Sequence, residues 1–304
     1  LVGWFGGGLI EPLAQSGTFR WWLVFVVMLA MTSTMPSWDR RQGRADSLGI
    51  VLASSLNALV VPALGLLVAW SLQSWVGDRL SAGVYVATLM PCTLASATVW
   101  SRRCGGSEAV AMGTTIVTNL AAVLVIPIGL LWVPGISLTD APEIGSPVAK
   151  LLGLIVLPLV IGRSIRRVAL IESQIERHRT KLRLFSQFGI LVMVALGASH
   201  SRQATALESF SLGILAVTIL ATGVTHWIAI WGALQASKRT GLPRATVIAC
   251  GIAGSQKTIM IGLQVAIDLG VSVVPMMVYH ATQLVVDEWM VRDAKIETRD
   301  ENSG

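Results

Sequence analysis

The stretch Ala253-Gly254-Ser255-Gln256-Lys257-Thr258 decides how this chain folds, because it places a charge inside a long apolar segment. Lys257 is the only lysine or arginine of the chain that lies in the middle of such a segment. A buried ammonium is costly in a bilayer, so an intramembrane lysine is by default a functional residue that faces a polar cavity or a partner. The stretch therefore predicts a transport or ion site at mid-membrane depth.

The composition around this stretch is that of a membrane protein. Hydrophobic residues make up 53% of the 304 residues and charged residues only 13%, more apolar surface than a soluble domain of this size hides. The apolar residues form blocks long enough to cross about 30 Å of hydrocarbon as helices. We therefore predict an all-α integral membrane protein. The predicted spans lie near Trp21–Pro36, Leu48–Leu72, Leu80–Ser101, Ala109–Ile136, Leu151–Gly162, Leu184–Ser199, Phe210–Ser237, Ala245–Ile267 and Gly270–Val286.

The first residues suggest one more helix. The chain is apolar from Leu1 to Ile10 and becomes polar at Glu11-Pro12. Ten helical residues cover only about 15 Å, so we expect Leu1–Ile10 to be the outer half of a truncated first helix, which brings the total to ten. A cleaved signal peptide is the alternative, but the basic region that defines one is absent.

The distribution of lysine and arginine gives the orientation. These residues accumulate in cytoplasmic loops. With ten helices and an internal N-terminus, 18 of the 23 fall in inner segments, 4 in outer ones, and Lys257 is the last. Both termini are thus predicted to be cytoplasmic. The same bias explains the net charge of +6, so we expect a lipid bilayer and no nucleic acid as partner.

Two other features bear on partners and cofactors. The basic linker 163–183 carries apolar residues among its charges, so it is either a helix on the cytoplasmic surface or a solvated loop. The three cysteines are odd in number and show no metal spacing, so we assign no disulfide, metal or other cofactor.

Two short segments of the chain resemble each other. Cys104–Ala109 and Ile252–Lys257 share Gly-Ser-(Glu/Gln), and each lies near an interrupted helix close to the end of a five-helix half. Halves with an odd number of crossings are inverted relative to each other, as in many secondary transporters. We therefore predict two inverted five-helix repeats, with helices 4 and 9 interrupted near Pro91–Thr98 and Gly251–Lys257 and crossed at the membrane midplane.

Polar residues at these interruptions are the first candidates for a site. A proline removes a backbone donor and frees a carbonyl, and the hydroxyls that follow Pro91 either bond the freed backbone or bind a solute. In the ninth helix, glycines loosen the chain beside the buried charge. The candidates of the two interruptions are Pro91, Thr93, Ser96, Thr98, Ser255, Gln256, Lys257 and Thr258.

The order and spacing of three segments resemble the bile acid:sodium symporter superfamily. They are Pro91 through Asn119 with its Gly-Gly-Ser-Glu-Ala and Thr114-Thr115, Cys250 through Thr258, and Pro275 through Gln283. The chain is similar in particular to the divergent branch that carries lysine in the second crossing helix, which Glu11-Pro12 also fits.

The resemblance implies a domain organisation and a function. A core of helices 3 to 5 and 8 to 10 carries the crossed helices, and a panel of helices 1, 2, 6 and 7 packs against it. The panel then comprises residues 1–44 and 147–200, including the linker 163–183, and the core comprises residues 45–146 and 201–304 with a cytoplasmic tail. Family members move organic anions by alternating access, typically with sodium, and the substrate lies between core and panel.

The sequence departs from the family's cation site. The family's Gln-x-x-x-x-Pro becomes Asn57 ahead of Pro62, its Ser-Asn becomes Ser96-Ala97, and its Glu-x-Gly-x-Gln-Asn becomes Ile252–Lys257. A carboxylate and two amides of the sodium cage are therefore missing. A lysine ammonium can take the place of a bound cation, and a buried lysine can gain and lose a proton during transport, so the coupling ion is sodium or a proton. The polar set left for a weak sodium site is Asn57, Thr114, Thr115, Asn119 and Gln256.

Further candidates lie at the ends of predicted helices. His280 and Gln283 share one face of helix 10 and are candidates to line the cavity, although a lone histidine in a helix is more often a packed residue. Glu108 either complements the dipole of helix 5 or contacts substrate. Asp287 and Glu288 are expected to be solvated at the cytoplasmic end of helix 10.

Several functions remain open from the sequence. The leading one is a transporter of a small organic anion with Lys257 in place of a coupling cation, and the next is an ordinary sodium-coupled symporter. An intramembrane hydrolase, with Ser255 as nucleophile and Lys257 or His280 as base, is a third, and a non-transporting receptor or scaffold a fourth. Residues two apart on a helix point to different faces and no oxyanion motif is present, so we predict that the protein is not an enzyme. The sequence specifies neither the solute nor the oligomeric state.

Overall fold

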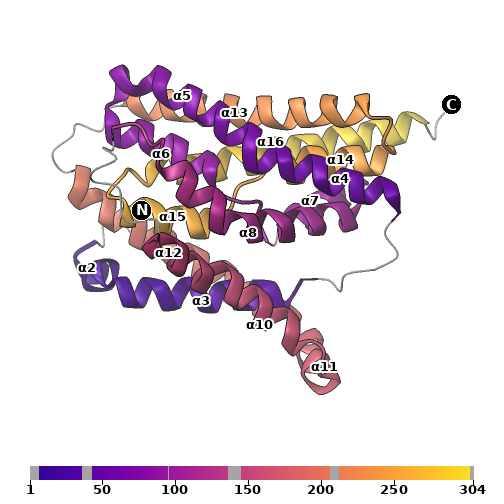
Figure 1. Cartoon of the computed structure of the whole chain (residues 1–304), viewed down its shortest axis with the longest axis horizontal. Coiled ribbons are helices and arrows are strands. Elements are labelled where there is room, and N and C mark those ends of the chain that lie inside the picture. The colour runs from indigo at the N-terminus through magenta and orange to yellow at the C-terminus, as the bar shows by residue number, and fades with distance from the viewer. Residues whose placement is uncertain (1–6, 36–42, 95, 136–144, 206–211, 302–304) are drawn as a thin grey trace.

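The structure, a computed structural model, describes residues 7–35, 43–94, 96–135, 145–205 and 212–301. Every regular element in these ranges is a helix, which confirms the all-α prediction. The helices run broadly along the long axis of the molecule (Figure 1). Six helical segments in the described ranges are long and apolar enough to cross a membrane, judged by length and composition.

The described residues of the first half of the chain form the helices from α2 to α8, which ends at residue 130. The helices α4, η1 and α5 follow one another without a break, η1 being a π-helical turn inside one long span. The bounds are α2 (Gly7–Gln15), α3 (Gly17–Ser33), α4 (Arg44–Ser55), η1 (Leu56–Val60), α5 (Val61–Val76), α6 (Asp78–Leu89), α7 (Ser96–Arg103) and α8 (Glu108–Leu130).

The second half repeats some of these features, including a π-helical turn inside a span. Its elements are α9 (Gly145–Leu151), η2 (Leu152–Val156), α10 (Leu157–Ile165), α11 (Ala169–Arg177), α12 (Arg179–Thr205), α13 (Leu212–Arg239), α14 (Arg244–Ser255), α15 (Ile259–Asp268) and α16 (Val274–Glu301).

Each predicted span overlaps a helix, with differences at the ends. The span predicted at Leu151–Gly162 is longer, because α9, η2 and α10 run together from Gly145 to Ile165. Of the truncated first helix, residues 1–6 lie outside the described residues, and α2 continues past Glu11-Pro12 to Gln15. The apolar helix α3 is shorter than the six long spans. The count of ten helices stays a prediction.

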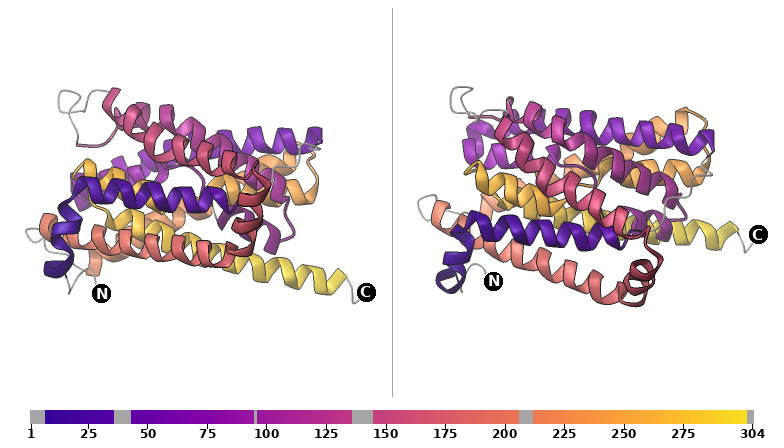
Figure 2. Two further views of the ribbon diagram at one scale, coloured as in Figure 1. Left: turned by 90° about the horizontal axis from the view of Figure 1, so that it is seen from below. Right: turned by 60° about the horizontal axis from the view of Figure 1, so that its bottom comes forward.

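The two predicted interruptions are confirmed. Helix α6 ends at Leu89 and α7 begins at Ser96, while α14 ends at Ser255 and α15 begins at Ile259. The two breaks touch, because the Thr258 N–H donates to the Pro91 carbonyl oxygen at 2.9 Å. In the span that contains α14 and α15, 94% of an 18-residue apolar window is buried, and in both views of Figure 2 the span lies inside the bundle.

The Gly-Ser-(Glu/Gln) likeness, in contrast, does not mark equivalent positions. Ser107 caps the start of α8, where its hydroxyl accepts from the Val110 N–H, and the preceding turn has Gly105 at φ +75°. Ser255 is the last residue of α14. One segment begins a helix and the other ends one, so the likeness gives no support to the inverted repeat, which stays a prediction.

The helices pack in two groups. Helix α3 packs against α10 and α12, and α2 packs against α12; in the other group α13 packs against α14 and α16, and α4 against α8 and α14. Figure 1 shows α3 and α10 along one side and α5 and α13 along the opposite side. Between them, α15 packs against α12 and α16 and so joins the groups.

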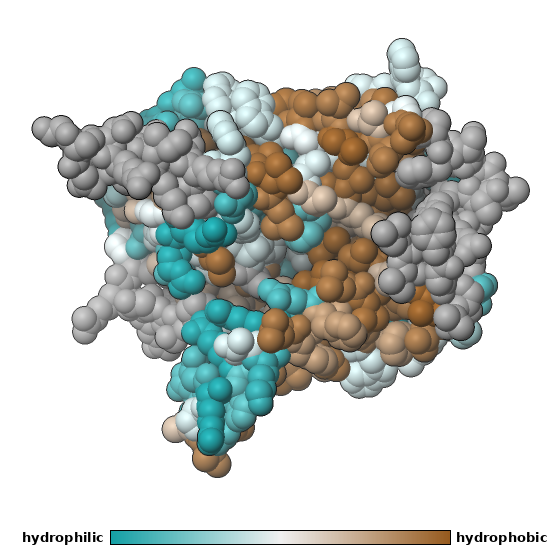
Figure 3. Space-filling view, turned by 180° about the vertical axis from the view of Figure 1, so that it is seen from behind, coloured by the Kyte–Doolittle hydropathy of each residue, from teal (hydrophilic) through white to brown (hydrophobic). Residues whose placement is uncertain are grey.

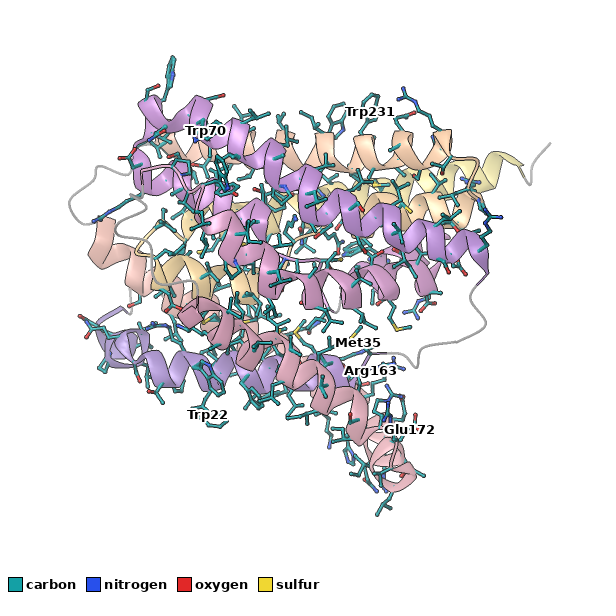
Figure 4. All side chains as sticks on the ribbon, viewed as in Figure 1. Trp22, Met35, Trp70, Arg163, Glu172 and Trp231 are labelled. Atoms are coloured by element: carbon teal, nitrogen blue, oxygen red, sulfur yellow. The ribbon has the colours of Figure 1, made fainter. Side chains whose placement is uncertain are left out.

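The outer surface suits lipid over much of the bundle. Trp22, Trp70 and Trp231 are exposed and point away from it (Figure 4), and Figure 3 shows apolar residues gathered over the middle of one face. The linker 163–183 contains the helix α11, so its helical conformation is confirmed, while its place on the cytoplasmic surface stays a prediction. Arg166 holds α11 in place by donating to Glu172 at 3.2 Å and to Glu176 at 2.8 Å.

Candidate functional site

The backbone of the first break is held by polar side chains of α8. The Asn119 amide donates to the Cys92 carbonyl oxygen at 2.8 Å, and the Thr115 hydroxyl donates to the Thr93 carbonyl oxygen at 3.2 Å. The Cys92 N–H donates to the Thr118 hydroxyl at 3.3 Å. Buried backbone groups outside a helix require such partners, so these side chains satisfy the break created at Pro91.

The backbone of the second break is held mainly by α16. The Lys257 N–H donates to Gln283 Oε1 at 3.0 Å, and Gln283 Nε2 donates back to the Lys257 carbonyl oxygen at 3.3 Å. The Tyr279 hydroxyl donates to the Ser255 carbonyl oxygen at 3.3 Å. Gln283 therefore fixes the position of Lys257 through its main chain and leaves the ammonium to another partner.

That partner is Asn57 in η1. Lys257 is completely buried, and its ammonium donates to the Asn57 carbonyl oxygen at 2.7 Å and lies 3.3 Å from Asn57 Oδ1. The Asn57 amide nitrogen in turn donates to the Gln256 carbonyl oxygen at 2.9 Å and to the Ala253 carbonyl oxygen at 3.2 Å. Among the described residues no carboxylate forms an ion pair with Lys257. The ammonium is thus coordinated by neutral oxygens, as a small cation is.

The local sequence explains why the Asn57 carbonyl is free. In an α-helix this oxygen accepts from residue 61, but the Val61 N–H donates to Leu56 because η1 has π-helical geometry. The next residue is Pro62, which has no N–H. Neither helical donor is left for Asn57, so its carbonyl oxygen accepts the ammonium instead.

Gln256 connects the second break to both α7 and α16. Its Nε2 donates to Asp287 Oδ2, and its Oε1 accepts from the Ser96 hydroxyl at 3.0 Å. Ser96 also shares a hydrogen bond with the Thr93 hydroxyl. Asp287 is completely buried, so the expectation that it is solvated is wrong. The neighbouring Glu288 is partly exposed and pairs with Arg103 at 3.4 Å.

A cavity of about 420 Å³ lies beside this network, between the two groups of helices. Its walls come from α3, α7, α12 and α16, and Ser96 and Thr98 bring the first break to its surface. Met35, labelled in Figure 4 at the end of α3, lies at one edge. Two arginines from opposite walls, Arg103 and Arg183, also line it. The cavity therefore offers an apolar wall together with positive charge.

The predicted site residues reach this region in different roles. Thr93, Thr115 and Asn119 hold the first break, Gln283 and Asn57 hold the second, and Thr258 joins the two. The Ser255 hydroxyl donates to the Gly251 carbonyl oxygen of its own helix at 2.8 Å, and His280 Nδ1 is bonded to the Gln283 amide at 3.0 Å. Ser255 therefore contacts neither Lys257 nor His280 as a nucleophile contacts its base.

The five residues predicted for a weak sodium site do not present a common set of free oxygens. Asn57 Oδ1 accepts a hydrogen bond from the Lys257 ammonium, and Gln256 Oε1 accepts one from the Ser96 hydroxyl. The Thr115 hydroxyl donates to backbone carbonyls. The Thr114 hydroxyl is buried without a hydrogen-bond partner, as is Asn119 Oδ1. Within the described residues no group of three His, Cys, Asp or Glu is placed to hold a metal ion.

Sequence reasoning missed Asp287, His226 and the two cavity arginines. His226 of α13 is completely buried, 3.8 Å from Asp287. A signal for Asp287 was present, because it follows Gln283 by four residues and so shares its helix face. The predicted span ended at Val286, directly before Asp287, whereas α16 continues to Glu301.

Comparisons with known proteins agree with this architecture. The family model of the SBF-like CPA transporter family matches residues 10–295. Sodium/bile acid cotransporter 7 of Xenopus tropicalis is 24% identical over 229 residues, which are 72% of this chain and 65% of that protein. Putative symporter YfeH of Escherichia coli is 25% identical over 248 residues, 79% of this chain and 73% of that protein. Sodium/bile acid cotransporter 7 of Mus musculus is 24% identical over 241 residues, 76% and 68% of the two chains.

The matched region covers nearly all the described helices, including both breaks and the Asn57–Lys257 contact. The aligned part of the Xenopus tropicalis protein is just under two thirds of its length, so that protein's own activity is not transferred here. The family and these relatives are named as transporters, which favours a transporter over the hydrolase. The chain therefore belongs to the SBF-like CPA transporter family, within the bile acid:sodium symporter superfamily, and is an integral membrane protein.

Proposed function

We propose that this protein is a secondary transporter that moves a small organic anion by alternating access, with the Lys257 ammonium in the position where related transporters bind a coupling cation. The observation that carries this proposal is the coordination of the ammonium by the Asn57 carbonyl and side-chain oxygens at the meeting point of the two breaks. Broken helices supply cation sites in transporters because their unwound backbone offers oxygens. A tethered ammonium uses the same oxygens. The proposal also assigns the chain to the lysine-bearing branch.

The proposed transporter has a panel and a core. The panel comprises residues 1–44 and 147–200, the core comprises residues 45–146 and 201–304, and the whole consists of ten helices in two inverted repeats with cytoplasmic termini. The packing of α3 with α10 and α12, and of α4 with α8 and α14, supports this division. Alternating access then consists of a movement of one group against the other.

The cavity between the groups is the proposed anion site. Arg103 and Arg183 supply positive charge, Ser96 and Gln187 supply hydrogen bonds, and Met31 and Leu284 supply an apolar wall. Arginine binds carboxylates and sulfonates through paired N–H donors, and an apolar wall accepts a hydrocarbon body. The expected substrate is therefore an amphipathic organic anion.

An ordinary sodium-coupled symporter is the second candidate. The relatives' names include sodium, and the Thr114 hydroxyl and Asn119 Oδ1 in α8 are buried oxygens without a partner. Oxygen ligands are the type that a hard cation such as sodium requires. This candidate needs further ligands, because the oxygens of Asn57 and Gln256 are already engaged.

Uptake by reconstituted vesicles tests the proposal. The protein is first screened for thermal stabilisation by a panel of organic anions that includes cholate. Radiolabelled uptake into sealed vesicles is then measured with external sodium or choline, against empty vesicles. We expect uptake to persist in choline, because Lys257 supplies the cation. A steep dependence on sodium would establish the second candidate, and the absence of uptake for every anion of the panel would overturn both.

A further inference from the structure

A buried pair of titratable groups lies next to the two helix breaks. Neither of its members contacts Lys257. His226 of α13 and Asp287 of α16 are both completely buried, with His226 Nε2 at 3.8 Å from Asp287 Oδ1. Asp287 Oδ1 and both ring nitrogens of His226 have no hydrogen-bond partner. Buried polar atoms without partners are rare in folded proteins and call for an explanation. Here three of them are concentrated in one pair.

The chemistry of the pair favours a proton as its ligand. Within the described residues no third His, Cys, Asp or Glu joins the pair to complete a metal site. An imidazole and a carboxylate that face each other can share a single proton, which binds to Nε2 and is then donated to Oδ1. The edge contact of His226 with the Tyr279 ring, at 5.6 Å between centroids, keeps the imidazole facing α16.

The pair is connected to the cavity by two hydrogen bonds. A carboxylate only accepts hydrogen bonds. Asp287 therefore fixes the orientation of the Gln256 side-chain amide, whose Nε2 points toward α16. Gln256 Oε1 is thereby turned toward Ser96, whose hydroxyl donates to it at 3.0 Å. Ser96 lines the cavity. The charge on Asp287 therefore determines how firmly one polar group of the cavity wall is oriented.

We propose that His226 and Asp287 form an exchangeable proton site whose occupancy controls how tightly Gln256 and Ser96 are held beside the cavity. When the site holds no proton, the Asp287 carboxylate that accepts from the Gln256 amide carries its full negative charge. Hydrogen bonds to an ionised acceptor are about twice as strong as neutral ones. The proton comes from a hydronium ion: one of its O–H bonds breaks, water is left, and an N–H bond forms at His226 Nε2 facing Asp287 Oδ1. The imidazolium then shares the carboxylate charge, and the hydrogen bond to Gln256 weakens. This site rests on the proposed transport function, to which it adds the proton as coupling ion.

The surrounding charges leave His226 as the natural acceptor of this proton. The other histidine near Asp287, His280, already uses Nδ1 in its bond to Gln283. Lys257 is occupied by Asn57, and Glu288 is paired with Arg103. Among the described residues, the other titratable groups within the electrostatic reach of Asp287 are Cys92, Cys104 and Tyr279.

A double-mutant cycle on the purified protein tests the site without any anion. The unfolding midpoints of the wild type, His226→Gln, Asp287→Asn and the double variant are compared between pH 5.5 and pH 9 at one scan rate. We expect the stabilising coupling between the two side chains to be larger at pH 5.5 than at pH 9, because a proton held between them joins them. The expected change in coupling is roughly 2–4 °C in the midpoint. A coupling that is the same at both pH values would overturn the proposal.

Two further comparisons keep the test decisive. If Asp287→Asn does not fold, the shift caused by His226→Gln alone must differ between pH 5.5 and pH 9, whereas the shift of the matched control His178→Gln, a partly exposed histidine on the α11–α12 turn, must not. A pH-independent shift for His226→Gln contradicts the site. Cholate uptake under an imposed proton gradient then separates the two proposals. A wild type without cholate uptake counts against the transport function alone, and uptake whose gradient response survives His226→Gln counts against proton coupling at this pair.

Discussion

The carbonyl oxygen of Asn57 lies 2.7 Å from the ammonium of Lys257, and it is available because residue 62 is a proline. In the π-helical turn the Val61 N–H donates to the Leu56 carbonyl oxygen. The next residue is a proline, which has no N–H to donate to Asn57. A backbone irregularity in one helix therefore creates the acceptor for a charge on another, 200 residues away in the sequence.

Pro62→Ala tests this relationship. Alanine introduces an N–H that competes with Lys257 for the carbonyls of the preceding turn. A hydrogen bond to a charged group is worth about 1.5–3 kcal/mol, so we expect anion uptake in reconstituted vesicles to fall by roughly tenfold or more.

Pro158→Ala is the matched control for this change. Pro158 follows η2 as Pro62 follows η1, and the Leu157 N–H likewise donates to Leu152. The Lys257 ammonium is bonded to Asn57 and to neither Leu157 nor Pro158. We expect Pro158→Ala to leave uptake near the wild-type rate, and an equal loss in both variants would show that the Asn57 carbonyl has no special role.

Lys257 itself gives the second prediction. Lys257→Ala leaves the protein folded, at a cost of about 1–3 kcal/mol for the acceptors that lose their donor, and abolishes uptake because the charge at the crossing is gone. Lys257→Arg restores it only in part, because guanidinium has a different geometry and does not release its proton. Uptake and the unfolding midpoint are measured on the same preparations.

The control for this series is Lys238→Ala, at the exposed end of α13. It removes the same charge from the surface and leaves both readouts unchanged. Full, pH-dependent uptake by Lys257→Ala would contradict the assigned role of the ammonium.

The sequence was sufficient to locate the two helix interruptions but not their hydrogen bonds. Pro91 and the glycines at 251 and 254 are local signals, and they predicted both interruptions. The partner of Lys257 is set by long-range packing, so Asn57 was placed near the site only by its resemblance to a family motif. The π-helical turn that frees its carbonyl has no sequence signature beyond the proline that follows it.

The misplacement of Asp287 has a different cause. Charge is a good indicator of the end of a membrane span on average, but a buried carboxylate that accepts from Gln256 is indistinguishable in sequence from a solvated one. The four-residue spacing from Gln283 was the only local sign. The likeness of the two Gly-Ser segments misled for the same reason, because a helix start and a helix end can share three residues.

A third prediction concerns the close approach of α5 and α6. A Cβ atom on Gly65 would overlap the side chain of Thr88, whose hydroxyl is fixed by a bond to the Tyr85 carbonyl oxygen at 2.7 Å. Overpacking of this kind costs about 1–3 kcal/mol, so Gly65→Ala lowers the unfolding midpoint by several degrees. Gly232→Ala, where a Cβ meets nothing within 4 Å, raises it slightly because alanine favours a helix by about 1 kcal/mol. Equal effects would show that the helices are not in close contact at Gly65.

The last prediction concerns Asp268, which ties α15 to the other group of helices. Its carboxylate pairs with Arg20 of α3 at 3.5 Å and with Lys150 of α9, and the Arg20 side chain is only 8% exposed. Asp268→Asn leaves this guanidinium without its counter-charge, and we expect a loss of about 1–3 kcal/mol, less than for a fully buried pair because Asp268 is partly exposed. Glu108→Gln is the control, since its pair with Arg102 is exposed on both sides and such pairs contribute about 0–1 kcal/mol. Unfolding midpoints of the two variants decide the matter: an Asp268→Asn protein as stable as Glu108→Gln would mean that Arg20 does not depend on this carboxylate to hold the two groups together.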